Sequence, residues 1–172
     1  DQRIRDCLDQ LVASLNLAAQ EEAARAIMTT DTFPKGASKI LHINGQPVTI
    51  SGFAKGSGMI APDMATMLVY IFTDAKISQP ELQATLGNLT NQTFNCITVD
   101  SDTSTSDALI CAATGTSGVD VTENLDFTEA LKQVMLDLAH QVVKDGEGAT
   151  KFVTVEVTSA RNDADARKVA MS

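Results

Sequence analysis

The chain has 172 residues, 44% of them hydrophobic and 20% charged, which is typical of one globular domain with a sizeable core and excludes a disordered chain. The formal net charge of -9 argues against nucleic acids and anionic membranes as partners and favours small solutes. Three cysteines without CxxC or Cys/His spacing exclude a disulfide framework and a zinc site, so we expect reduced, buried thiols in a cytoplasmic protein. No apolar run approaches the roughly 20 residues of a membrane helix.

The first 28 residues carry a helical pattern. Apolar side chains recur at three- and four-residue spacing up to Leu15, and an alanine-rich stretch of good helix formers follows over residues 18–28. We therefore expect two helices, or one bent helix. A polar loop rich in hydroxyls follows over residues 29–36. Because the chain starts without Met and directly in a helical pattern, we expect a segment of a longer protein.

A β-hairpin is predicted next. Residues 39–43 and 48–53 are strand-like and flank Asn44 and Gly45, the strongest short signal for a hairpin turn. Pro47 leaves open a turn longer than two residues. This hairpin supplies the first strand pair of the predicted sheet.

A glycine-broken stretch then leads to a core strand. Gly56 and Gly58 allow positive φ and close backbone approach, and the apolar run over residues 68–72 predicts a buried strand. Thr66 stands at the head of this run. The arrangement can hold a threonine hydroxyl rigidly against one backbone carbonyl.

Helices and strands alternate in the rest of the chain. We expect a helix from a capping box at Ser78 to about Asn91, a short strand over 95–99, a buried strand or helix over 108–114, an amphipathic helix from a capping box at Asp126 to Asp145, a strand over 152–158, and a last helix capped by Asn162 or Asp163. This mixture predicts a single α/β (α+β) layered sandwich over residues 1–172, with mixed sheets, flanking helices and a site at strand ends.

Ala65 and Thr66 permit two interpretations. A threonine before an apolar strand is most often a strand-starting residue with a satisfied hydroxyl. The alternative is self-processing, in which the Thr66 hydroxyl attacks the Ala65 carbonyl, an N-to-O shift gives an ester, and hydrolysis frees Thr66 as a new N-terminus. Its α-amine, with an ordinary pKa of ~7.7, can then act as base for its own hydroxyl. This chemistry needs no Ser/His/Asp set, and neither His42 nor His140 lies in one.

A metal site is not expected. Asp100, Asp102 and Asp107 lie in one hydroxyl-rich stretch, which raises the alternative of a calcium loop. The stretch lacks the central glycine and the terminal glutamate of an EF-hand. A structural loop near a site is therefore the favoured interpretation.

Four motifs in order cover nearly the whole chain. They are TTDTFPK over residues 29–35, KGSGMIAPDMATML over 55–68, VDSDTST over 99–105 and KDGEGATK over 144–151. Together they resemble the arginine-biosynthesis ornithine acetyltransferases, which are glutamate N-acetyltransferases. The resemblance implies part of a larger, N-terminal-nucleophile-like enzyme that moves the acetyl group of N2-acetyl-L-ornithine to L-glutamate by a ping-pong reaction. It implies no cofactor, and it leaves open whether acetyl-CoA is a second donor.

The resemblance also implies a precursor cleaved between Ala65 and Thr66. Residues 1–65 would end an α subunit, residues 66–172 would begin a β subunit, and the assembly would be α2β2. Thr66 would be the acetylated nucleophile.

The family's substrate contacts fall on Thr29, Lys55, Thr66 and Glu147. Lys55 and Glu147 supply the cation and the anion that an amino-acid substrate needs, although without the resemblance they would be interpreted as solvated charges in turns. The family's Thr-Gly oxyanion pair falls before Asp1, and further substrate contacts fall after Ser172. A missing oxyanion donor typically costs about 100- to 1000-fold in rate. A self-cleaving Thr aminopeptidase or amidase, and a non-catalytic, uncleaved domain, stay open as alternatives.

Overall fold

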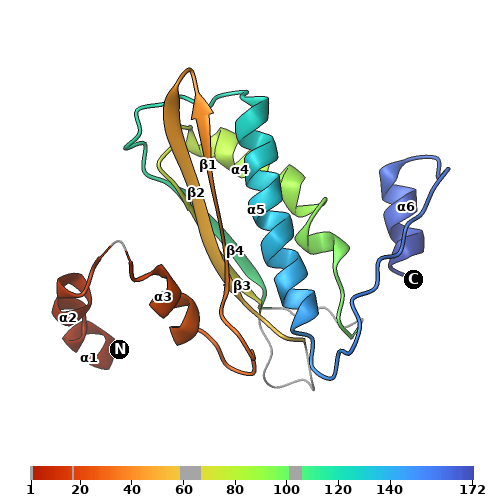
Figure 1. The fold of residues 1–172 in the computed structure, drawn as a ribbon, viewed down its shortest axis with the longest axis horizontal. Coiled ribbons are helices and arrows are strands. Elements are labelled where there is room, and N and C mark those ends of the chain that lie inside the picture. The colour runs from red at the N-terminus through yellow and green to blue at the C-terminus, as the bar shows by residue number, and fades with distance from the viewer. Residues whose placement is uncertain (1, 17, 59–66, 101–105) are drawn as a thin grey trace.

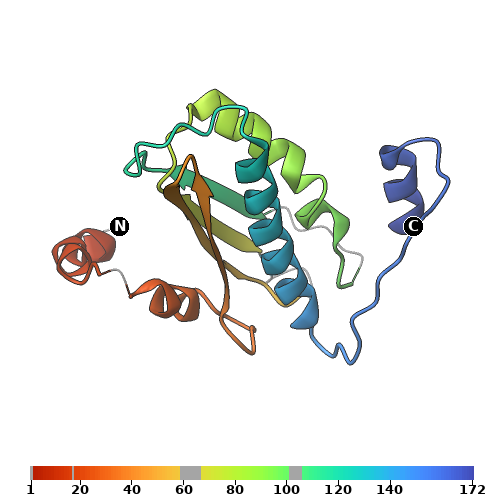
Figure 2. The ribbon, with the colours of Figure 1, turned by 45° about the horizontal axis from the view of Figure 1, so that its top comes forward.

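The computed structural model describes residues 2–16, 18–58, 67–100 and 106–172. Its elements are α1 (Gln2–Asp6), α2 (Leu8–Ala13), α3 (Gln20–Ala26), β1 (Lys35–Ile43), β2 (Gln46–Lys55), β3 (Leu68–Thr73), α4 (Gln79–Thr90), the 3₁₀ helix η1 (Phe94–Cys96), β4 (Ala108–Ala113), α5 (Leu125–Lys144) and α6 (Asp163–Ala170). The strands form one sheet in the order β1-β2-β3-β4, with α4 and α5 packed on the same face (Figures 1 and 2). The predicted α/β layered fold is confirmed.

The sheet is mixed. β1 and β2 are antiparallel and joined by the two-residue turn Asn44-Gly45, whose φ angles of 52° and 79° are those of a hairpin turn that matches strand twist. The longer turn that Pro47 left open does not form. β2 and β3 are antiparallel, whereas β3 and β4 are parallel and connected through α4. As a result, the start of β1, the end of β2 and the start of β3 lie at the same end of the sheet.

The core lies between this sheet and α5. Ile50 and Ile71 on the strands are fully buried, as are Leu131 and Leu138 on the helix. At Gly52 on β2, an added Cβ would lie 2.9 Å from the Tyr70 carbonyl oxygen on β3 and 3.3 Å from Leu138 Cδ1 on α5. A glycine is needed there because any side chain would clash with the β3 backbone and press against the helix.

The opposite face of the sheet is only partly covered. α3 lies against it, and the Gln20 side chain donates to the Gly52 carbonyl at 3.2 Å and accepts from Ser51 Oγ at 2.5 Å. Elsewhere on this face three large apolar side chains are exposed: Ile40, Phe72 and Ile110. The predicted helical start is confirmed, but the apolar side chains of α1 and α2 are also exposed, and both helices lie away from the sheet in Figure 1.

Three local predictions are wrong. Residues 95–99 form no strand, and the first two of them belong to η1, because the Thr93 hydroxyl donates to the Leu89 carbonyl at 2.8 Å and continues the end of α4. Residues 152–158 form no strand, because they pair with none of the described strands. α5 is capped by Asn124, which accepts from the Phe127 amide at 2.9 Å, and Asp126 is already inside the helix.

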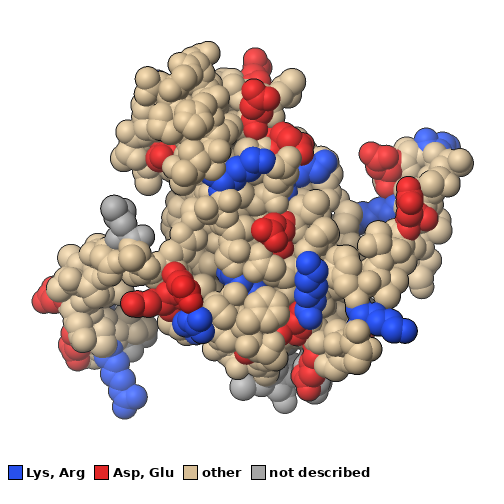
Figure 3. Space-filling model, in the orientation of Figure 1, with Lys and Arg blue, Asp and Glu red and all other residues tan. Residues whose placement is uncertain are grey.

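The cysteine prediction also needs correction, because Cys7 and Cys96 are exposed and Cys111 on β4 is half-buried. Three other predictions are confirmed: α4 is capped by Ser78, β4 is a strand, and α6 is capped by Asn162. On the face in Figure 3, Lys and Arg are dispersed among Asp and Glu. None of the described helices combines the length and the apolarity that a membrane crossing requires.

Candidate active site

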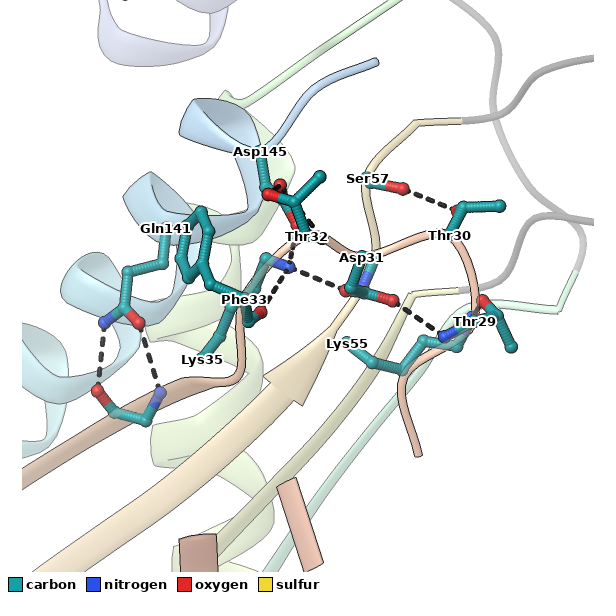
Figure 4. Close-up of polar contacts among 12 residues, drawn as sticks. Thr29, Thr30, Asp31, Thr32, Phe33, Lys35, Lys55, Ser57, Gln141 and Asp145 are labelled. Carbon is teal, nitrogen blue, oxygen red and sulfur yellow. Dashed lines mark hydrogen bonds and ion pairs between the residues drawn. The ribbon is translucent and has the colours of Figure 1, made fainter. Parts of the chain in front are cut away.

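Three loops meet at the end of the sheet where β1 begins and β2 ends (Figure 4). They are the loop before β1 (residues 29–34), the start of the segment after β2 (residues 56–58) and the turn after α5 (residues 145–148). Three of the residues that the resemblance singles out lie on these loops or next to them. The antiparallel pairing of β1 and β2 and the direction of α5 bring the loops together.

Lys55 is a buried cation without a carboxylate partner among the described residues. It is the last residue of β2 and is 7% exposed, and its Nζ donates to Thr29 Oγ1 at 2.9 Å. The predicted substrate contacts Thr29 and Lys55 are therefore in direct contact (Figure 4). An ammonium has three donors, and a buried one is costly unless an anion lies beside it. The geometry suits an anionic ligand.

Glu147 lies on the neighbouring turn. Its backbone amide donates to the Ser57 carbonyl at 2.8 Å, which joins the turn to the segment after Lys55. Its exposed side chain borders a hollow of about 470 Å³ that Thr30 and Thr32 also line. Both Glu147 and Lys55 are described, and no ion pair joins them. Both charges are thus left for other partners.

The predicted cleavage site, Ala65 and Thr66, lies outside the described residues. Before it, Gly56 and Gly58 have φ angles of 148° and 127°, which confirms the predicted positive φ in this stretch. The described chain resumes at Met67, whose amide donates to Asp107 Oδ1 at 2.9 Å.

Sequence reasoning missed a buried ion network formed by Asp31, Lys35 and Asp145. Lys35 is fully buried, and its Nζ donates to Asp31 Oδ1 at 2.6 Å and to Asp145 Oδ2 at 2.5 Å. The Phe33 ring lies 4.8 Å from the same nitrogen. Thr32 adds its amide, 3.0 Å from Asp145 Oδ2, and its hydroxyl, which donates to Asp145 Oδ1. Every charge in the network has an opposite charge beside it.

Asp31 is held as a carboxylate. Burial alone would raise its pKa, but hydrogen bonds from the Gly56 amide, the Lys35 ammonium and the Thr29 amide lower the pKa below its ordinary value. The four-residue spacing of Asp31 and Lys35 was the one available sequence signal for this network. Asp145 lies 110 residues beyond Lys35, so no local pattern could connect them.

The described residues contain no group of three or more His, Cys, Asp or Glu that could hold a metal ion. The charges of Lys55 and Glu147 and the nearby hydroxyls of Thr29 and Thr30 can support the recognition of a charged small molecule.

The family model, the relatives and the solved structure that match this chain all carry the name ArgJ. A model of the ArgJ family matches residues 1–172. The arginine biosynthesis bifunctional protein ArgJ of Ruegeria pomeroyi is 65% identical over 96% of this chain and 41% of its own length. The protein of the same name from Caulobacter vibrioides is 52% identical over 99% of this chain and 44% of its own length. The chain thus spans less than half of each relative.

A solved structure agrees with these relatives. The crystal structure of the arginine biosynthesis bifunctional protein argJ from Bacillus halodurans superposes with a TM-score of 0.55 at 44% sequence identity. The superposition covers 62% of this chain and 51% of that one.

Proposed function

The chain belongs to the ArgJ family, and we propose from this that it is part of an acetyltransferase that moves the acetyl group of N2-acetyl-L-ornithine to L-glutamate. Both substrates carry a carboxylate close to the reacting nitrogen. Lys55 carries the proposal, because its buried ammonium has only the Thr29 hydroxyl as a partner among the described residues. A substrate carboxylate would supply the missing negative charge. Glu147 would bind a substrate ammonium.

The proposed nucleophile is Thr66, freed by self-cleavage of the Ala65–Thr66 bond. Its hydroxyl oxygen would attack the acetyl carbonyl of N2-acetylornithine, the amide C–N bond would break, and the hydroxyl proton would leave with the ornithine amine. The glutamate amine would then attack the acetyl-Thr66 ester and return a proton to the hydroxyl. Both steps pass through an oxyanion, whose donors the resemblance assigns to residues before Asp1.

We also propose that the cleaved parts, residues 1–65 and the part that begins at Thr66, remain together in an α2β2 assembly. β2 precedes the bond and β3 follows it, and they pair from Lys55 with Leu68 to Ile50 with Thr73. α5, which follows the bond, packs on β1 and β2, which precede it. Cleavage would therefore leave a shared sheet and core intact.

A product assay on the full-length protein tests the transfer. Acetylornithine should be consumed with formation of N-acetylglutamate, and the rate should depend on glutamate. Equal consumption with and without glutamate, with only free acetate formed, would instead identify a hydrolase. Replacement of acetylornithine by acetyl-CoA in the same assay tests whether acetyl-CoA can also serve as the acetyl donor.

The mass spectrum of the intact protein tests the cleavage. We expect two species that divide at Ala65/Thr66, and one unsplit species for the Thr66→Ala variant. A single uncleaved species for the wild-type protein would identify a non-catalytic domain and refute the proposed mechanism.

A further inference from the structure

The buried ion network of Asp31, Lys35 and Asp145 has a geometry that stability alone does not explain. Burying three charges carries a large desolvation cost, and apolar side chains of the same volume often stabilise a fold equally well or better. Charged hydrogen bonds differ from apolar contacts because they fix directions and lengths. The role of the network can therefore be inferred from the groups whose positions it fixes.

Asp31 fixes the Thr29 and Lys55 side of the candidate site. Its Oδ2 accepts from the Thr29 amide at 3.1 Å, and its Oδ1 accepts from the Gly56 amide at 2.7 Å. Gly56 directly follows Lys55. One carboxylate thus holds the backbone at or beside both members of the Lys55–Thr29 contact.

Asp145 fixes the Glu147 side. It lies at the end of α5, two residues before Glu147, and accepts from both the amide and the hydroxyl of Thr32. The Glu147 amide in turn donates to the Ser57 carbonyl. The turn that presents Glu147 is therefore tied to the loop before β1 and to the segment after β2.

We propose that the buried ion network sets the separation between Lys55 and Glu147, the cation and anion that would bind the carboxylate and the amine of an amino-acid substrate. The inference rests on the proposed function. Asp31, Lys35 and Asp145 are positioning residues, because the fully buried Lys35 ammonium joins the two carboxylates inside the protein. Their role extends beyond holding the fold together.

The first test is Asp145→Asn in the full-length enzyme. Asn keeps the shape and one acceptor but loses one of the two negative charges that hold Lys35. We expect kcat/KM to fall roughly 100-fold, because a misplacement of about 1 Å has that effect. The loss should be mainly in KM, for both acetylornithine and glutamate, since the network holds the loops of Lys55 and Glu147, the groups proposed to bind the substrates. An unchanged KM in the folded variant would overturn the proposal.

Gln141→Ala is the matched control. The Gln141 side chain also joins α5 to β1, by accepting from the Gly36 amide at 3.1 Å and donating to the Gly36 carbonyl at 3.0 Å (Figure 4). It makes no hydrogen bond to the described residues of the three loops. We expect a lower melting temperature with KM within about twofold of wild type, as for a mutation of the scaffold alone. An equal rise of KM in this control would show that any loosening of α5 affects binding, and would overturn the proposal.

A charge-restoring pair separates positioning from folding. Lys35→Met leaves two buried carboxylates, and adding Asp145→Asn returns the network to its native net charge without rebuilding the link. We expect the double variant to recover stability relative to Lys35→Met while KM stays high. Recovery of KM together with stability would identify a purely structural network.

Crystal structures of wild-type protein and the Asp145→Asn variant give a readout independent of activity. We expect residues 29–32 and 145–148 to shift relative to each other while the Asn44-Gly45 hairpin stays in place. Unmoved loops would overturn the positioning role even in an active enzyme. If the loops are displaced in the variant but the wild-type protein transfers no acetyl group, the proposed function is refuted and the positioning role stays supported.

Discussion

Two buried lysines at the same end of the sheet differ in the partners that their ammonium groups have. Lys35 begins β1 and is surrounded by Asp31, Asp145 and the ring of Phe33. Lys55 ends β2 and has the hydroxyl of Thr29 as its described partner. Both are nearly inaccessible, at 0% and 7% exposure. The difference separates a cation that the protein neutralises for itself from a cation whose charge is available to a ligand.

The comparison matters because burial alone does not distinguish structural from functional charge. A buried ammonium must have an anion nearby, and the anion is supplied either by the chain or by a bound molecule. A residue of the first kind should affect stability most when removed, and a residue of the second kind should affect activity most.

Lys35→Met should have the largest effect of all on stability. It leaves Asp31 and Asp145 buried without their shared cation, and breaking a buried pair in this way typically costs about 3–5 kcal/mol. Urea unfolding of the full-length variant measures this loss. A loss below about 1 kcal/mol would remove the contrast between the two lysines.

Lys55→Met should reverse the pattern. Without the ammonium, the substrate carboxylate would lose a desolvated charged partner, and we expect kcat/KM to fall about 100-fold or more. Stability should change by less than about 1 kcal/mol, because the variant removes one hydrogen bond to Thr29 and leaves none of the described carboxylates unpaired. Steady-state kinetics and urea unfolding on the same preparation test both halves.

Lys39→Met is the control for Lys55→Met, since Lys39 lies on the same sheet, is half-buried, and donates from its Nζ to the neutral side chain of Gln133. It should leave both kinetics and stability near wild type. An effect of Lys39→Met as large as that of Lys55→Met would mean that general loss of positive charge explains the result.

Acid unfolding sharpens the Lys35 half of the comparison. Burial would raise the pKa of Asp31, but its hydrogen bonds from Gly56, Lys35 and Thr29 lower that pKa below the ordinary value. The unfolded chain therefore binds the proton more readily, so this part of the stability is complete above about pH 3.9 and is lost as the pH falls through the lower, folded value. Asp31→Asn should unfold with a shallower dependence on pH in this range. An unaltered slope would show that Asp31 is not held as a carboxylate.

The sequence predicted the elements whose causes are local. Asn44 and Gly45 specified the hairpin because few other residue pairs accept two positive φ angles, and the leucine spacing in α4 specified its buried stripe. The strand predicted for residues 152–158 is wrong because an alternation of polar and apolar residues gives a strand only when another strand lies beside it.

The site was predictable only in part, for the same reason. The resemblance singled out Lys55 and Thr29, which the fold brings into direct contact, and their role in substrate binding stays a prediction. The ion network went unnoticed because Lys35 and Asp145 meet only when β1 and α5 pack together, and neither residue lies in a local pattern that predicts the other.

The half-buried thiol of Cys111 is a third titratable group on this sheet, and its replacement or modification should have the smallest effect. It has no charged partner among the described residues, and burial raises the pKa of its thiol to about 11. At pH 8 it should hold roughly 200-fold less thiolate than an ordinary thiol of pKa about 8.5, and thiolate is the reactive form. Iodoacetamide should therefore modify Cys111 far more slowly than the exposed Cys7 and Cys96, as peptide mass mapping can follow. Equally rapid modification of all three would show that the thiol of Cys111 ionises normally, and that burial on this sheet does not suppress an unpaired charge. The inference that the buried Lys55 ammonium needs an anionic ligand would then be weaker, because burial at this sheet would not by itself disfavour an unpaired charge.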